Sequence, residues 1–159
     1  MTTNSIGEPV VRQTRARAPV ETVYSLWVEP EKLLRWMGVS ADLDPRPGGT
    51  FRINVTGRDV AVGEYTAVEA GSRLAFTWGW EAPGHPIPPG SSSVEVTFTQ
   101  EGEITIVRVA HSGLPASEKM NTAYGWQHYL TRLGMAAIGR ESGPDPWVVP
   151  EAHGSTAPS

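Results

Sequence analysis

The stretch Ser117–Gly139 reads SEKMNTAYGWQHYLTRLGMAAIG, and it decides the fold of this chain. Serine is a common helix cap, and glycine suits the position just past a helix end, so the stretch predicts one helix over 118–138. A helix of this length spans roughly 30 Å. Apolar residues recur along one side of it at intervals of four, three and four, namely Trp126, Leu130, Leu133 and Ala137.

The residues before this helix alternate between apolar and polar side chains, which is the period of β-strands. Turn-forming residues separate the alternating segments, as in the run Arg46-Pro47-Gly48-Gly49. A loop with four prolines, 81–91, interrupts the series. The segments predicted as strands are 10–17, 51–55, 60–68, 74–80, 94–98 and 104–111.

Two short helices are predicted between the first two strands. Pro19 suits the start of a helix, and Glu21 then lies in the first turn, where the helix dipole favours an acidic side chain. Pro30 and Glu31 repeat this start signal, and Gly38 ends the second helix.

This order of elements indicates the α+β class. We expect a helix-grip fold, in which a curved antiparallel β-sheet wraps round the long C-terminal helix. Residues 10–140 are predicted to form this domain, after a flexible N-terminus over 1–9. Residues 141–159 are rich in Gly, Pro and Ser and are predicted to be a flexible tail. The apolar run 147–149 inside the tail could instead pack back onto the domain.

The composition excludes several classes of protein. The formal net charge of -4 leaves no basic face for binding nucleic acid. The absence of cysteine excludes disulfides and thiolate sites and fits a cytoplasmic protein. We expect no secretory signal and no membrane insertion. No pair of histidines has metal-ligand spacing supported by a carboxylate, so no metal is expected, and no other cofactor is expected either.

Motifs along nearly the whole folded part carry a resemblance to a known family. They are Trp27 with Pro30-Glu31-Lys32-Leu33, Arg35-Trp36-Met37-Gly38, Asp44-Pro45-Arg46-Pro47-Gly48-Gly49, Arg73-Leu74-Ala75-Phe76-Thr77-Trp78, His111-Ser112-Gly113-Leu114-Pro115, and Gly125-Trp126 followed by Leu130 and Leu133. With these motifs in order, the chain resembles the START-like (SRPBCC) superfamily. Within it, the chain is similar to bacterial proteins related to the activator of heat-shock-protein-90 ATPase.

The resemblance implies a cavity under the long helix that takes hydrophobic or amphipathic ligands. Members of the superfamily include lipid carriers and polyketide cyclases, so the fold alone does not fix the function. Met37 stands where a second aromatic residue is expected after Trp36, and methionine is the more adaptable side chain.

Aromatic and aliphatic side chains on the sheet and the helix are the candidates for the cavity walls. The alternative is that they fill an ordinary core, but Gly125, Gly134, Ala136 and Ala137 fill little volume and favour a partly open interior. The predicted sheet wall is Phe51, Phe76, Trp78, Trp80 and Phe98. The predicted helix wall is Trp126, Leu130 and Leu133, and the predicted gate is Trp36 and Met37.

His111 is the one weak candidate for a catalytic residue, and it is also a candidate for lining the cavity. It ends a strand on the same face as Val107 and Val109, so it is expected to point inward. It could act as a general base near neutral pH. A buried, hydrogen-bonded histidine that fixes the loop leading to Pro115 is the preferred interpretation.

The other polar candidates have ordinary structural explanations. Tyr124 and His128 share a helix face that could line a cavity mouth but fits a solvated surface better. Glu81 could be a cavity acid, but an exposed loop carboxylate is preferred.

Two further groups also have ordinary structural explanations. Asp44 and Arg46 could pair at a pocket rim, although a role in stapling the turn is preferred. His85 and His153 are expected to be solvated.

Three functions follow as hypotheses. The first is binding of a small hydrophobic or amphipathic molecule in the cavity. The second is an enzyme of the cyclase or hydratase type in which His111 moves a proton. The third is a co-chaperone-like interaction domain that forms a homodimer or binds another protein.

Overall fold

This computed structural model describes residues 8–149 of the chain. They contain seven strands, three α-helices and a short 3-10 helix. The strands are β1 (Val10–Ala16), β2 (Ser40–Leu43), β3 (Thr50–Asn54), β4 (Val60–Glu69), β5 (Arg73–Trp80), β6 (Ser92–Glu101) and β7 (Ile104–Ser112). The helices are α2 (Val20–Val28), α3 (Pro30–Leu33), the 3-10 helix η1 (Ala116–Glu118) and α4 (Lys119–Ala137).

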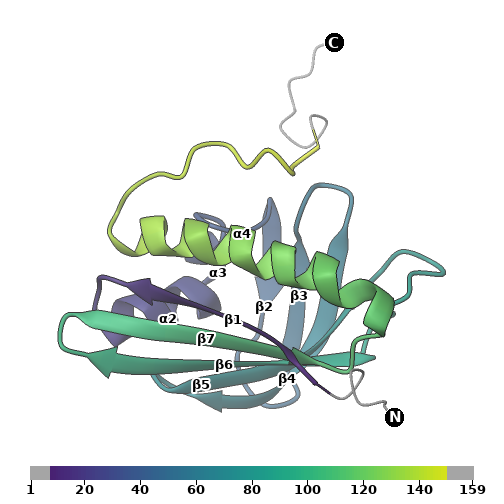
Figure 1. Cartoon of the computed structure of the whole chain (residues 1–159), viewed down its shortest axis with the longest axis horizontal. Helices are drawn as coiled ribbons and strands as arrows, with labels where there is room; N and C mark the ends of the chain where they lie inside the picture. Colours follow the sequence, from purple (N-terminus) through teal and green to yellow (C-terminus); the bar gives the residue numbers. More distant parts are fainter. Residues whose placement is uncertain (1–7, 150–159) are drawn as a thin grey trace.

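The strands form one antiparallel sheet in the order β1-β7-β6-β5-β4-β3-β2. Short turns join the consecutive strands from β2 to β6, except for the long loop after β5, and a tight turn joins β6 to β7. The first strand, β1, pairs with the last, β7, and Val10 lies opposite His111. An irregularity in β4 between Tyr65 and Ala67 shifts its register against β5, and such bulges increase the local twist of a sheet. The sheet curves beneath α4 (Figure 1).

Helix α4 covers the sheet and buries the predicted apolar stripe. Trp126, Leu130 and Leu133 are all buried, and the helix ends with Gly139 in the left-handed conformation at φ 75°. The predicted cap is wrong, because Ser117 lies within η1 and Glu118 takes the cap position without a side-chain cap bond. The reason is the 3-10 turn after Pro115, which was not visible in the sequence pattern.

The α+β class and the helix-grip arrangement are confirmed, including the two short helices after the first strand. One strand was not predicted: β2 has only four residues, Ser40–Leu43, and its side chains alternate between exposed and half-buried. It is identified only by its pairing with β3, in which Leu43 lies opposite Phe51.

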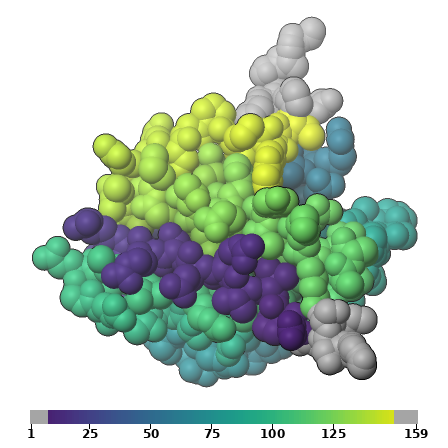
Figure 2. Space-filling view, in the orientation of Figure 1, coloured from purple at the N-terminus to yellow at the C-terminus, as the bar shows by residue number. Residues whose placement is uncertain are grey.

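Residues 141–149 of the predicted tail lie against the domain, which agrees with the alternative that the apolar run 147–149 packs back onto it. Asp145 is buried, and the backbone N–H of Val149 donates to the Thr56 carbonyl oxygen at 2.8 Å, in the turn between β3 and β4. This segment, yellow in Figure 2, lies on α4. Residues 1–7 and 150–159, which hold most of the predicted N-terminal segment and His153, lie outside the described residues.

None of the helices in residues 8–149 has the length and apolar character needed to cross a membrane.

Candidate functional site

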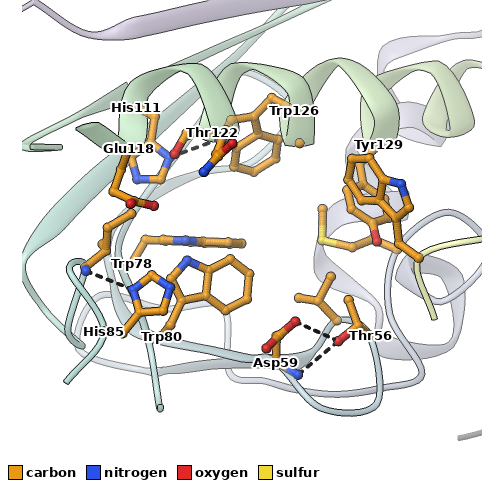
Figure 3. A pocket seen from close by; sticks show the side chains of 16 residues that line it. Thr56, Asp59, Trp78, Trp80, His85, His111, Glu118, Thr122, Trp126 and Tyr129 are labelled. Atoms are coloured by element: carbon orange, nitrogen blue, oxygen red, sulfur yellow. Dashed lines mark hydrogen bonds between the residues drawn. The ribbon is translucent and has the colours of Figure 1, made fainter. Parts of the chain in front are cut away.

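A cavity of about 310 Å³ lies between the N-terminal half of α4 and one end of the sheet (Figure 3). Its walls come from α4, from β5 and the loop after it, from the β3–β4 turn and from the segment after α4. Most of its exposed lining is apolar, and five of the lining side chains are Trp or Tyr. These five are Trp78, Trp80, Trp126, Tyr129 and Trp147.

The sheet side of the cavity is built by the end of β5 and the loop that folds back on it. Trp78 and Trp80 alternate onto the cavity face, with their indole centroids 5.4 Å apart and nearly perpendicular. Gly79 between them faces the returning loop, where any Cβ atom would collide with the Pro88 carbonyl oxygen. The Trp80 backbone N–H donates to the Ile87 carbonyl oxygen at 2.8 Å. This close approach brings the buried Ile87 into the cavity wall.

The helix side is a stripe of α4 with helical spacing. Gly125, Trp126 and Tyr129 line the cavity, and the more polar Asn121 and Thr122 precede them toward the N-terminus. Trp126 crosses to the sheet, with its ring centroid 5.5 Å from that of Trp78. A Cβ atom added at Gly125 would meet nothing within 4 Å, so this glycine faces open space. Of the four small residues predicted to leave room, Gly125 lines the cavity, and Gly134, Ala136 and Ala137 do not.

His111 is 1% exposed and belongs to a chain of hydrogen bonds behind the cavity wall. The indole N–H of Trp126 donates to His111 Nδ1 at 3.0 Å. His111 Nε2 lies 2.9 Å from Ser92 Oγ, and the Ser92 hydroxyl donates to the Trp78 carbonyl oxygen at 2.6 Å. An indole can only donate and a carbonyl can only accept, so the chain has one direction, in which His111 Nε2 carries the proton.

This environment does not suit a general base. Burial lowers the pKa of His111 from 6.5 to about 3, so the ring is neutral at physiological pH. Its one lone pair, on Nδ1, already accepts the Trp126 N–H. The inward position of His111 is confirmed, and its hydrogen bonds tie β7 to β6 and α4.

The segment after α4 closes another side of the cavity through Asp145. This carboxylate accepts hydrogen bonds from the Tyr129 hydroxyl at 2.6 Å and from the Trp147 backbone N–H at 3.0 Å, and it lies 2.8 Å from His128 Nε2. The indole of Trp147 stacks on the His128 ring at 3.8 Å between centroids. We call residues 141–149 the clasp, because they join α4 to the β3–β4 turn.

The clasp shifts the pKa values of its own groups. Burial alone would raise the pKa of Asp145, but the hydrogen bonds from Tyr129, the Trp147 backbone and His128 outweigh it and lower that pKa below the usual carboxyl range. Burial and the hydrogen bond to Asp145 raise the pKa of the Tyr129 hydroxyl. Asp145 is therefore held as a carboxylate and Tyr129 as a donor at neutral pH.

Five of the eleven predicted cavity residues line this cavity: Met37, Trp78, Trp80, His111 and Trp126. The other six do not. They pack in the hydrophobic core farther along the sheet and the helices, and they are Trp36, Phe51, Phe76, Phe98, Leu130 and Leu133.

Close mutual packing explains why these six leave no space. Phe51 stacks on Phe76 with centroids 4.1 Å apart. The Trp36 indole donates to the Leu26 carbonyl oxygen at 2.8 Å, so Trp36 is a core residue and no gate. Phe98 packs edge-on against Tyr24.

In two cases the remaining polar candidates do not lie where they were predicted. Tyr124 and His128 separate, because Tyr124 is 65% exposed whereas His128 is covered by the clasp. His85 is half-buried at the cavity rather than solvated, and its Nδ1 accepts the Ile87 backbone N–H at 2.9 Å.

Two ion pairs follow the preferred predictions. Arg46 Nε lies 2.8 Å from Asp44 at an exposed turn. Glu81, just after β5, is an exposed carboxylate that pairs with Arg52 of β3 across the intervening strand β4. Within residues 8–149, no three His, Asp or Glu side chains gather as a metal site would require.

Several lining residues were not predicted from the sequence, notably Thr56, Asp59, Ile87, Glu118 and Trp147. They come from turns, loops, the clasp and, for Glu118, the 3-10 helix η1. No periodic pattern marks such positions, although the apolar run at Trp147 was a signal of packing.

Comparison with known proteins identifies the family to which the chain belongs. Residues 17–137 match the family described as Activator of Hsp90 ATPase homolog 1-like protein. A solution structure of an AHSA1-like protein from Rhizobium etli is 43% identical, with a TM-score of 0.70, over 89% of this chain and 88% of that one.

Two further relatives are longer than this chain. DynU16, from the dynemicin biosynthetic locus, is 26% identical with a TM-score of 0.74, over 85% of this chain and 49% of its own. The Schizosaccharomyces pombe protein C1711.08, which is uncharacterized, is 26% identical over 121 residues, or 72% of this chain, and the match spans only 32% of its own length. Because the family match covers most of the chain, and the solved relatives share its fold, the chain belongs to the Activator of Hsp90 ATPase homolog 1-like protein family of the START-like superfamily.

Proposed function

We propose that this domain binds a small, largely apolar molecule in the cavity between α4 and the sheet. The observation that carries the proposal is the cavity of about 310 Å³ with five Trp or Tyr side chains in its wall. This volume is near the lower end of the range of ligand pockets, roughly 300–1,000 Å³. A molecule of one to a few rings therefore fits better than a long lipid chain.

The construction of the walls supports a binding role. The Trp126 indole is held from behind by its hydrogen bond to His111, and the Trp78 indole is buried and packs against Trp126 with ring centroids 5.5 Å apart. Side chains that are ordered before the ligand arrives lose little conformational entropy on binding. The cavity is thus preorganised, whereas the tightly stacked aromatic residues around Phe51 and Phe76 form solid core.

A proton-transferring enzyme is less well supported by this geometry. Both ring nitrogens of His111 are engaged in hydrogen bonds, and its pKa is lowered by burial. We therefore retain binding as the proposed function.

Two measurements test the proposal. Native mass spectrometry of the freshly purified protein should detect a retained small molecule. In a second measurement, the neutral fluorescent probe N-phenyl-1-naphthylamine should bind and quench the tryptophan emission, because four indoles line the cavity.

Gly125→Leu should abolish probe binding by filling the open space at that position. Gly134→Ala is the matched control, because Gly134 lies on the same helix, outside the cavity lining, and a Cβ atom there makes only an ordinary 3.7 Å contact with Thr14. A parent protein that neither retains a molecule nor binds the probe would refute the proposal.

A further inference from the structure

The formally charged side chains that line the cavity are both acidic. They are Asp59, in the turn between β3 and β4, and Glu118, at the N-terminus of α4. The described lining includes no lysine and no arginine. In Figure 3 the two carboxylates lie on opposite sides of the Trp78 and Trp80 indoles, Glu118 beside His111 and Asp59 beside Thr56.

The two histidines in the lining do not offset this negative charge. His85 Nδ1 accepts the Ile87 backbone N–H at 2.9 Å, and His111 Nδ1 accepts the Trp126 indole N–H at 3.0 Å. His111 is therefore neutral, and Nδ1 of His85 is occupied by a backbone amide and does not face the cavity as a free donor.

The carboxylates are also free of basic partners within residues 8–149. Neither Asp59 nor Glu118 forms an ion pair there, and Lys119, next to Glu118, instead donates to the Glu8 carbonyl oxygen at 2.9 Å. Asp59 Oδ2 accepts the Thr56 hydroxyl at 3.1 Å. Both groups keep lone pairs available to a bound molecule.

The aromatic walls have the same electrostatic preference. The face of an indole is negative, and Trp is the side chain that attracts a cation most strongly in this way. Trp78 and Trp80 stand at 88° to each other, so they form two sides of a corner. Acidic side chains and aromatic faces therefore both favour positive charge in the ligand.

We propose that the ligand of this cavity is an organic cation, a protonated amine or quaternary ammonium joined to an apolar group. Its apolar part lies against Trp126 and Tyr129, and its charged end lies against the Trp80 indole, where the carboxylates of Asp59 and Glu118 attract it from either side. This inference rests on the proposed binding function and names the chemical class of its ligand.

A matched series of probes tests the inference on the full chain. The probes are (1-naphthylmethyl)trimethylammonium, neutral 1-naphthylmethanol and anionic 1-naphthylacetate, titrated by calorimetry at low salt. The cation is expected to bind about tenfold more tightly than the neutral probe, and the anion more weakly than both. Equal or tighter binding of the neutral or anionic probe would overturn the cation inference and leave the binding function standing. Failure of all three to bind would overturn both.

Charge-removing variants locate the preference. Glu118→Gln and Asp59→Asn should each weaken binding of the cation about two- to fivefold more than they weaken binding of 1-naphthylmethanol. Glu103→Gln is the control, because this exposed carboxylate lies in the hairpin at the far end of β7 from His111. Equal effects of all three substitutions on the cation would show that only the overall charge matters, and would overturn the site.

Discussion

The hydrogen-bond partners of the His111 imidazole allow only one tautomer, with the proton on Nε2. Trp126 can only donate and the Trp78 carbonyl can only accept, so the direction of the chain through His111 and Ser92 does not depend on solvent. Protonation would place two N–H donors against each other at Nδ1, inside a buried site. This arrangement is incompatible with charge on the ring, which agrees with the lowered pKa.

The lowered pKa of His111 predicts a loss of stability in acid. The folded pKa of about 3 lies below the ordinary value of 6.5, so the unfolded chain binds a proton that the folded chain excludes. The stabilisation is complete above pH 6.5 and is lost as the pH falls toward 3. Each pH unit in this window costs about 1.4 kcal/mol, or about 2–3 kcal/mol between pH 6.5 and 4.5. Urea unfolding at several pH values measures it.

His111→Gln provides the comparison, because glutamine does not titrate. The parent should lose stability more steeply than this variant over the same pH range, whatever the absolute stability of the variant. Parallel curves for the two proteins would show that His111 is not the group responsible.

One buried carboxylate, Asp145, bonds two side chains of α4, so a single substitution there should loosen the clasp. Asp145→Asn removes the charge that accepts three hydrogen bonds and should lower the free energy of unfolding by about 1–3 kcal/mol. In the parent, the same stabilisation should disappear as acid protonates Asp145, below the usual carboxyl range.

Glu141→Gln is the control for this prediction, because Glu141 is an exposed carboxylate at the start of the same segment. Denaturant midpoints of the two variants should differ clearly. Similar midpoints would mean that the clasp contributes little to stability and only covers the cavity.

The fold could be predicted because its strands and helices have strong periodic signals. Alternation over 92–101 and the apolar stripe on α4 each specify one buried face. The misses have weak local signals: β2 is four residues long, and its pairing with β3 is a long-range contact. The clasp forms through Asp145, whose partners on α4 are 16 and 17 residues earlier in the chain, and no local pattern predicts such contacts.

The candidate site could be predicted only in part, for a related reason. A period of two indicates which face of β5 points inward, so Phe76 and Trp78 were treated alike. The period does not indicate at which positions along the strand the space opposite is filled by other side chains. Phe76 meets Phe51 at 4.1 Å and lies in solid core, whereas Trp78 borders the cavity. Position along a strand is decided by what packs opposite, which depends on the whole fold.

The molecule divides into a packed end and a hollow end. The packed end contains α2 and α3 against the sheet, with Leu26, Leu33 and Trp36 buried. The hollow end lies under the first turns of α4, where the helix presents Gly125 to the sheet. Stability and ligand binding therefore depend largely on different parts of one domain, and they should be separable by substitution.

Gly125→Leu should raise the stability of the free protein while removing its response to ligand. Replacing a helix-interior glycine by leucine gains about 1 kcal/mol, or about 2–4 °C in Tm for a chain of this size. A ligand at a hundredfold excess over its Kd stabilises the parent by about 2.7 kcal/mol, and this shift in Tm should vanish in the variant. Gly134→Ala should raise Tm similarly but keep the shift. Thermal unfolding with and without 1-naphthylmethanol measures all three proteins. If Gly125→Leu were less stable than the parent when free, the space beside Gly125 would be filled rather than hollow, and if it kept the full ligand shift, binding would occur elsewhere.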